Sequence, residues 1–258
     1  LRRQRQMCIR DSYKNKITYL PDEKKTTVMD GHGGYMNGSR YYGEDLPINT
    51  WYMKRFAGLS EDGLSLWYYT DKETNEEKTT TTYSTGDFYL CGDPNPDLYG
   101  GFGTSITFHG FDLSTQFSYL VGGLTYDYGY AGMMGNPTAT SVGNRWHKDV
   151  LKAWSPENPS STIPRWYFND LNTTGSSDRF LIDGSYLNLQ NIQVGYTLPD
   201  SWTSHLKIKN LRLYFVCDNV YYWSKRKGLD PRRSISGVGT SGKIAPFRTY
   251  SGGISLQF

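Results

Sequence analysis

The sequence predicts an all-β protein: an antiparallel meander of about six strands, forming the C-terminal part of a large transmembrane β-barrel with long extracellular loops. Two regularities support this prediction. Apolar and polar residues alternate along several segments of about ten residues, and the connections between these segments alternate between long and short. Strands of this length cross a bilayer when tilted, and outer-membrane barrels combine short periplasmic turns with long outer loops.

The clearest alternation is at the C-terminus. One face of this segment would carry Tyr250, Gly252, Ile254, Leu256 and Phe258, and the other Thr249, Ser251, Gly253, Ser255 and Gln257. A soluble sheet buries its apolar face, whereas a membrane barrel turns that face to lipid and its polar face to a wet lumen. The terminal pattern also resembles the assembly signal of outer-membrane barrels, which would here consist of Gly253, Leu256 and Phe258.

The strands are expected, in order, at residues 13–20, 102–108, 113–123, 185–198, 207–217 and 247–258. The first is short and is interpreted as truncated at its start. The second follows a glycine-rich entry. The third and fourth also alternate, and in the fourth Ile192, Val194 and Tyr196 oppose Gln193 and Thr197. The fifth alternates less cleanly, and the sixth carries the terminal pattern.

The connections are long at 21–101, 124–184 and 219–246 and short at 109–112 and 199–206. Compact soluble domains rarely contain several structureless connections longer than about 15 residues. Two of the long connections show local patterns of their own. Residues 145–154 have helical spacing before Pro156, and the threonine-rich stretch at 76–85 predicts a short hairpin.

Residues 1–12 are set apart from the rest of the chain. They resemble translated adapter sequence and are expected to be a non-native addition, which leaves 13–258 as the C-terminal part of the barrel. Four Arg and one Asp give them a net charge of +3, which equals the net charge of the whole chain. The remaining residues are therefore neutral overall, and no nucleic-acid partner is expected.

The remaining composition is informative mainly by exclusion. No run of about 18 apolar residues is present, so no transmembrane helix is expected. The three cysteines form neither a CxxC motif nor an even framework, and the four isolated histidines form no HExxH motif. No GxSxG sequence supports nucleophilic catalysis. We therefore predict that the chain is not an enzyme and has no catalytic residue, metal ligand or cofactor, and Asp93, Asp97 and Asp127 lack EF-hand spacing for Ca²⁺.

Four stretches, taken in order, resemble the SusC/RagA-type TonB-dependent outer-membrane transporters of Bacteroidota. They are FAGLSEDGLSLWYY at 56–69, GDPNPDLYGGFGTSITFHGFDL at 92–113, the DGSYLNLQN strand within 178–198, and RLYFVCDNVYYWSKRKGLDP at 212–231. Each string is weak alone, and their order and spacing carry the resemblance. The chain departs from the family near Cys217, at Asp62, and in having Arg232 after Asp230 and Pro231, where the family commonly has Glu.

The resemblance implies a function and partners. The intact protein would import oligosaccharides, or less often peptides, through the outer membrane. A SusD-like surface lipoprotein would act as its lid, and TonB would drive import through a plug that lies outside this chain. The barrel-assembly machinery and outer-membrane lipid would be its other partners. No bond is made or broken in such a process.

Loop aromatics are the candidate substrate-binding residues, because a flat ring covers the apolar face of a pyranose. The candidates are Trp146, Trp154, Trp166 and Trp223. The alternative for each is a place in the interfacial aromatic girdle or in loop packing. Lys225, Arg226, Lys227, Arg232 and Arg233 make the 219–246 loop basic, which fits either an anionic contact or a solvated loop.

Two other functions remain open. A passive porin has the same wall but needs no plug. A secreted β-sandwich with glycan-binding or glycosidase activity would share an apolar core face between two sheets and carry a carboxylate pair in a cleft. The alternating loop lengths and the terminal signal favour the transporter.

Overall fold

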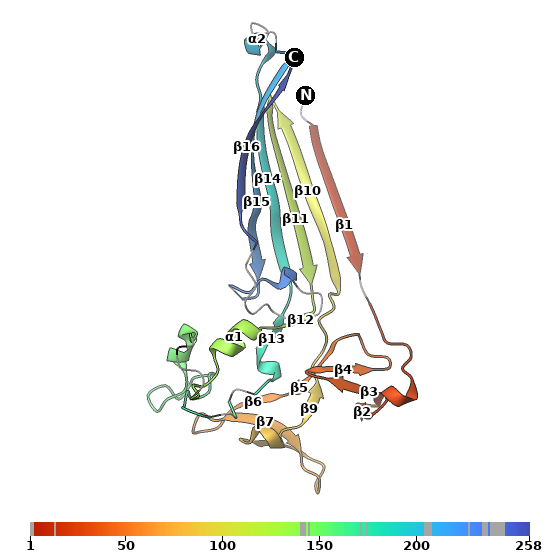
Figure 1. The fold of residues 1–258 in the computed structure, drawn as a ribbon, viewed down its shortest axis with the longest axis vertical. Helices are drawn as coiled ribbons and strands as arrows, with labels where there is room; N and C mark the ends of the chain where they lie inside the picture. Colours follow the sequence, from red (N-terminus) through yellow and green to blue (C-terminus); the bar gives the residue numbers. More distant parts are fainter. Residues whose placement is uncertain are drawn as a thin grey trace.

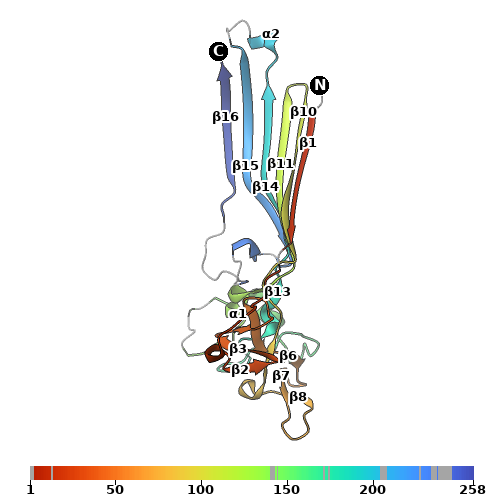
Figure 2. The ribbon, with the colours of Figure 1, turned by 90° about the vertical axis from the view of Figure 1, so that its right-hand side faces the viewer.

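The computed structural model describes residues 3–12, 14–139, 143, 145–170, 172–173, 175–203, 208–226, 228–233, 237 and 246–258. One long antiparallel sheet forms the upper part of the molecule, and a module built from the long connections lies at one end of it (Figures 1 and 2). The sheet has six strands in the order β1-β10-β11-β14-β15-β16. Their bounds are Arg3–Ser12, Leu98–Phe108, Phe111–Val121, Tyr186–Thr197, Asn210–Ser224 and Thr249–Gln257.

The sheet is open, because β1 and β16 each pair on one side only. This confirms the predicted meander of about six antiparallel strands and the exposed edge at the C-terminal strand. The other edge is a correction. It lies at β1 rather than at 13–20, and the residues from 14 to 20 form a connection in which the Ile17 amide donates to the Leu46 carbonyl at 2.9 Å.

The strand register sorts apolar and polar side chains onto opposite faces. Ile106, Leu113, Val194 and Phe215 form one apolar row across four strands. The adjacent row is polar at Ser105, Ser114, Gln193 and Ser251, and Val216 is its apolar member. Val194 and Ile254 are 43% and 65% exposed, so within the described residues no second layer covers the apolar face. The predicted parity is confirmed within β14 and β16, and Phe258 lies beyond the end of β16.

Two bulges interrupt the register at mid-sheet. β14 gains Gln190 relative to β11, and β15 gains one residue relative to β14 near Asn219. Asn219 has a φ of 51°, which asparagine tolerates better than most residues. Each bulge restores the alternation on its far side, so Leu189 and Tyr221 share the apolar face with Ile192 and Cys217.

The end of the sheet away from the loop module carries the short connections. His109 and Gly110, with φ values of 47° and 84°, make a two-residue turn between β10 and β11 of the kind that matches strand twist. The helix α2 (Asp200–Thr203) lies in the connection from β14 to β15. Both chain termini lie at this end (Figure 1). No helix within the described residues has the length and apolar character needed to cross a membrane.

The loop module, defined as the described residues of 14–97 and 122–185, is folded rather than structureless. Its five-stranded sheet has the order β2-β3-β4-β5-β9, its three-stranded sheet β6-β7-β8, and β12 pairs with β13. The strand bounds are Thr27–Met29, His32–Asn37, Arg40–Gly43, Thr50–Lys54 and Phe88–Leu90; Phe56–Leu59, Ser65–Thr70 and Glu77–Thr80; and Leu124–Tyr126 and Leu181–Asp183.

Short helices complete the module and the remaining connection. They are α1 (Tyr128–Met133) and the 3₁₀ turns η1 (Asp22–Lys24), η2 (Tyr83–Thr85), η3 (Lys148–Lys152) and η4 (Asp178–Phe180), with η6 (Pro231–Arg233) in the last connection. The helical spacing expected at 145–154 corresponds to η3. The threonine-rich stretch expected to form a hairpin contributes β8, which pairs with β7, and η2.

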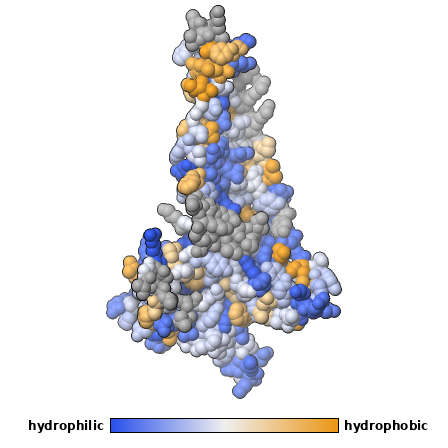
Figure 3. All heavy atoms as spheres, viewed as in Figure 1, coloured by the Kyte–Doolittle hydropathy of each residue, from blue (hydrophilic) through white to orange (hydrophobic). Residues whose placement is uncertain are grey.

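The module has its own core. Trp51, Met53, Tyr126, Met134 and Phe180 are almost completely buried against one another. These residues come from β5, β12, the end of α1 and η4, and the Trp51 indole donates to the Leu124 carbonyl at 3.0 Å. The two longest connections are therefore held together by non-local packing. Seen from the side of Figure 1, the surface of the module is mostly hydrophilic, most of all at its protruding tip (Figure 3).

Candidate functional site

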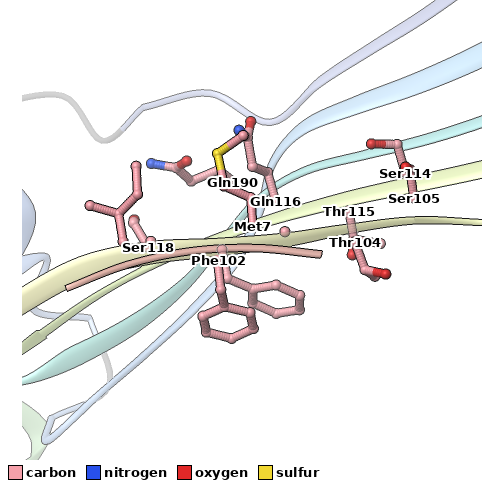
Figure 4. Close-up of a pocket in the computed structure, with 13 residues that line it drawn as sticks. Met7, Phe102, Thr104, Ser105, Ser114, Thr115, Gln116, Ser118 and Gln190 are labelled. Atoms are coloured by element: carbon pink, nitrogen blue, oxygen red, sulfur yellow. The ribbon is translucent and has the colours of Figure 1, made fainter. Parts of the chain in front are cut away.

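The polar face of the sheet carries hydroxyl and amide groups at its centre. A groove of about 730 Å³ is lined there by Ser105, Ser114, Gln116, Ser118 and Gln190, with Met7 from the edge strand. In Figure 4, Gln116, Gln190 and Met7 project from one side of the sheet while Phe102 projects from the other. This face of the sheet therefore presents neutral hydrogen-bond donors and acceptors.

A second cavity, here called the junction pocket, lies where the sheet meets the loop module. Its volume is about 620 Å³. The polar face contributes Tyr99, Ser118, Leu120, Tyr186 and Gln190, and the connections add Pro94, Pro96, Pro231 and Arg232. Rings and prolines give it flat apolar walls with a few polar groups, the usual composition of a ligand site.

Arg232 is the cation among the described residues that line this pocket. Its Nε and Nη2 donate to the two oxygens of Asp230, both at 2.7 Å, and its Nη1 donates to Asn188 Oδ1 at 2.7 Å. The guanidinium also lies 4.6 Å from the Tyr222 ring centroid. The hydrogen bond from Asp230 raises the pKa of Arg232 above its usual value. The arginine is therefore fixed in place and its charge is balanced locally.

We call the described residues of 224–233 the strap. Its other end is attached to the loop module, where Arg226 pairs with the buried carboxylate of Asp127 and lies 4.5 Å from the Tyr130 ring centroid. Asp127 also caps α1 by accepting from the Tyr130 amide at 3.0 Å. Two arginines thus join the strap to the module on one side and to the sheet on the other.

A second ion pair spans the polar face near the short turns. Arg212 donates from Nε and Nη2 to the Asp112 carboxylate at 2.9 and 2.6 Å. Asp112 is on β11 and Arg212 on β15, so the bridge crosses β14 between them. It passes over Gly195, where an added Cβ would collide with both partners. Sequence inspection did not identify this bridge, because its members are distant along the chain.

Buried cations stabilise the module itself. The Lys54 ammonium donates to the carbonyls of Tyr83 and Gly86 at 2.5 and 2.6 Å, and burial lowers its pKa. Arg40 lies 3.1 Å from the Trp51 ring centroid, and burial lowers its pKa to about 10. These groups are satisfied by backbone and rings inside the module, which indicates a structural role.

The structure brings two of the four predicted binding tryptophans together. The rings of Trp146 and Trp166 meet edge to face at 5.4 Å, and both indoles donate to the Gly135 carbonyl, at 3.2 and 3.3 Å. Both are more than a third exposed. Trp154 instead packs over Gly63, where an added Cβ would collide with its ring.

Trp223 is apart from the other three. It lies on the apolar face at the loop-module end of β15, 4.8 Å from the Tyr221 ring. This position favours the interfacial girdle for Trp223 and leaves the Trp146–Trp166 pair as the exposed candidate on the module.

The proposed assembly-signal residues occupy the edge strand and the residue after it. Gly253 pairs with Tyr214, whose ring covers the space a Gly253 side chain would need. Leu256 pairs with Leu211 on the apolar face, and Phe258 is 73% exposed. The glycine has a packing reason within this chain, and the role of the three in assembly stays a prediction.

Other residues singled out in the sequence do not form a site in the described part of the chain. No group of three or more His, Cys, Asp or Glu side chains there could hold a metal ion. Asp93 accepts from the Asn95 amide at 2.9 Å in a local turn. Cys8, Cys91 and Cys217 are free thiols, and His205 lies outside the described residues.

Sequence comparison finds relatives among TonB-dependent receptors. TonB-dependent receptor P3 of Formosa agariphila is 28% identical over 275 aligned positions, which cover 95% of this chain and 26% of the relative. TonB-dependent receptor SusC of Bacteroides thetaiotaomicron is 27% identical over 180 positions, which cover 69% of this chain and 17% of SusC. No family model matches the chain.

Solved structures share the fold. The RagAB peptide transporter superimposes with a TM-score of 0.80 at 21% identity, covering 100% of this chain and 27% of that one. The RagAB peptide importer in the open-open state gives 0.78 at 22% identity. The chain spans about a quarter of the length of the TonB-dependent receptors P3 and P26 of Formosa agariphila. Within the described residues the sheet is open and its apolar face is uncovered, and the chain is similar over most of its length to part of the TonB-dependent receptors and shares the fold of the RagAB structures.

Proposed function

We propose that the intact protein imports a nutrient oligomer across the outer membrane in a TonB-dependent manner, and that this chain supplies part of its barrel wall and outer loops. The sorting of faces on the open sheet is the observation that carries this proposal. The apolar rows would contact lipid and the hydroxyl and amide rows would line the lumen. The loop module would then lie on the cell exterior and the short turns in the periplasm.

Oligosaccharides are the proposed substrates, with peptides as the second class. The exposed Trp146–Trp166 pair and the tyrosines of the junction pocket support ring stacking against sugars. The relatives of known structure are named as peptide transporters, which keeps peptides open. A SusD-like lipoprotein is the proposed partner at the outer end, TonB would act through parts outside this chain, and the barrel-assembly machinery would insert the protein.

Energy dependence separates this function from a passive porin. Cells that express the intact gene should accumulate a labelled oligosaccharide that supports their growth, and deletion of the gene should abolish the uptake. Loss of TonB should abolish it equally. Uptake that continues without TonB would indicate a porin and contradict the proposal. The sandwich alternative has no support from the described residues, because no second sheet covers the apolar face.

A further inference from the structure

The junction pocket combines flat apolar walls with a few hydroxyl and amide groups. Tyr99, Leu120 and Tyr186 form its sheet wall, and three prolines line the side of the connections. Ser118 and Gln190 supply hydroxyl and amide groups. Flat apolar walls with few polar groups suit a ring that has an apolar face and hydrophilic edges.

The charged residues that line this pocket are Arg232 and Asp11. Asp11 belongs to the segment that the sequence indicates is non-native. We therefore infer the ligand preference of the pocket from its lining residues between 94 and 232 alone. Arg232 would by itself attract anions, since a guanidinium matches a carboxylate in a two-bond geometry. Its side chain is 14% exposed and that of Asp230 is 8%, so the pair is screened weakly by solvent.

The pairing consumes most of the hydrogen-bonding capacity of the arginine. A guanidinium has five N–H donors. Three of them are used by the two bonds to Asp230 and the bond to Asn188. Asp230 therefore both neutralises Arg232 and occupies the edge with which it would grip a carboxylate.

We propose that Asp230 sets the charge preference of the junction pocket: by pairing with Arg232 it makes the pocket select an uncharged ligand unit with a flat apolar face, such as a neutral pyranose. This inference rests on the proposed import function and adds a specificity-determining residue to it. Without Asp230, the Arg232 fork would face the pocket and favour ligands that carry a carboxylate.

Two probes that differ only in a carboxylate test this preference: methyl β-glucoside and methyl β-glucuronide, titrated by NMR against the purified full-length transporter. The unchanged protein should bind the glucoside more tightly than the glucuronide. Asp230→Asn should tighten glucuronide binding by about tenfold and leave glucoside binding nearly unchanged, and added salt should reduce the gain. Tyr186→Ala should weaken both, which places the binding in the pocket.

Two further variants show whether a gain in glucuronide binding comes from the unpaired charge of Arg232 or from loosening of the strap. Asp230→Asn combined with Arg232→Gln removes both charges and should restore the preference for the glucoside. Asp112→Asn is the control, because it removes the partner of Arg212 in the same way at a distant site. Asp112 lies eight residues along β11 from Leu120 of the pocket, or roughly 26 Å away, so this variant should change the affinity for neither probe. A gain in glucuronide binding that persists in the double variant or appears in Asp112→Asn would overturn the proposal.

The remaining outcomes are also decisive. If the unchanged protein binds neither probe, or binds the glucuronide more tightly, the pocket does not select neutral units and the inference fails. Binding in detergent needs no energy source, whereas uptake by cells does. TonB-dependent uptake without the Asp230 effect would therefore refute this inference alone, and uptake that is absent from cells would refute the proposed function.

Discussion

Single residues on the polar face decide whether distant groups can meet. Gly195 has no side chain, and this lets Asp112 and Arg212 bridge across the strand between them. At the other end of the sheet, Arg232 donates hydrogen bonds to Asn188 on β14 and to Asp230 in the last connection, and so also joins groups that are distant along the chain. In the sequence these residues look like an ordinary strand glycine and scattered charges. Only the Asp230-Pro231-Arg232 string indicates an ion pair from the sequence alone, because its acid and base are two residues apart.

Gly195→Ala should break the Asp112–Arg212 bridge. The added methyl group would occupy the space between the carboxylate and the guanidinium, and loss of a charged hydrogen-bonded pair costs about 1–3 kcal/mol. The measurement is the unfolding temperature of the intact protein, followed by its folded and unfolded bands on gels. Gly252→Ala is the matched control, because its nearest neighbour beyond the adjacent residues would be 3.9 Å away. Equal shifts in both variants would show that the bridge contributes nothing.

Lys54→Met should loosen the loop module while leaving the sheet intact. The substitution keeps the buried apolar stem and removes the ammonium that satisfies the carbonyls of Tyr83, Ser84 and Gly86. Buried acceptors left without a donor cost about 1–3 kcal/mol. Limited proteolysis of intact cells should then cut the module faster. Lys72→Met, an exposed change on the β7–β8 turn, should leave the cutting rate unchanged, and an unchanged rate for Lys54→Met would refute the role.

At the scale of elements, side-chain alternation allowed β10, β11, β14, β15 and β16 to be predicted, because each carries its own pattern of period two. β1 could not be predicted, since Arg3–Ser12 has little apolar alternation and is placed by pairing with β10. The strands of the module were missed for a different reason. Many have only three to six residues, and their stability comes from a core shared by residues as distant as Trp51 and Phe180.

Ile254→Arg tests which face of β16 meets lipid. An arginine on the lipid face near the midplane costs about 2–4 kcal/mol and less near an interface. Folded protein in outer-membrane fractions should therefore fall strongly. Ser251→Arg places the same side chain on the polar face opposite Val216, away from Arg212, and should be much milder. Similar losses for the two variants would contradict the assignment of faces.

Deletion of Phe258 tests the proposed assembly signal. The residue lies beyond β16 and is exposed, so its removal from an ordinary frayed end would cost little. If the terminal strand is read by the assembly machinery through its edge, the deletion should lower the heat-modifiable folded form without lowering synthesis. Wild-type levels of the folded form would leave Phe258 without a role in assembly.

At the scale of the whole molecule, the short turns and both termini gather at one end and the long connections fold into a module at the other (Figure 1). Loop-length alternation predicted this asymmetry from the sequence. It did not predict that the long connections would pack into one body or that the strap would tie that body to the sheet through Arg226 and Arg232. Those features depend on contacts between residues far apart in the chain.

The central claim is that the sheet belongs to a transmembrane barrel and that the loop module lies outside the cell. Cysteine accessibility in intact cells is the most direct test of this claim. Thr74→Cys lies on the exposed β7–β8 turn and Ser201→Cys on the exposed α2. Each would be placed in the intact protein, which lacks the non-native segment that contains Cys8. Labelling of the unsubstituted parent gives the background, to which Cys91 should contribute little, since burial raises the pKa of its thiol to about 11. A membrane-impermeant maleimide should label residue 74 in whole cells and residue 201 only after the outer membrane is opened. Equal labelling of both sites in whole cells, or the reverse order, would contradict the account.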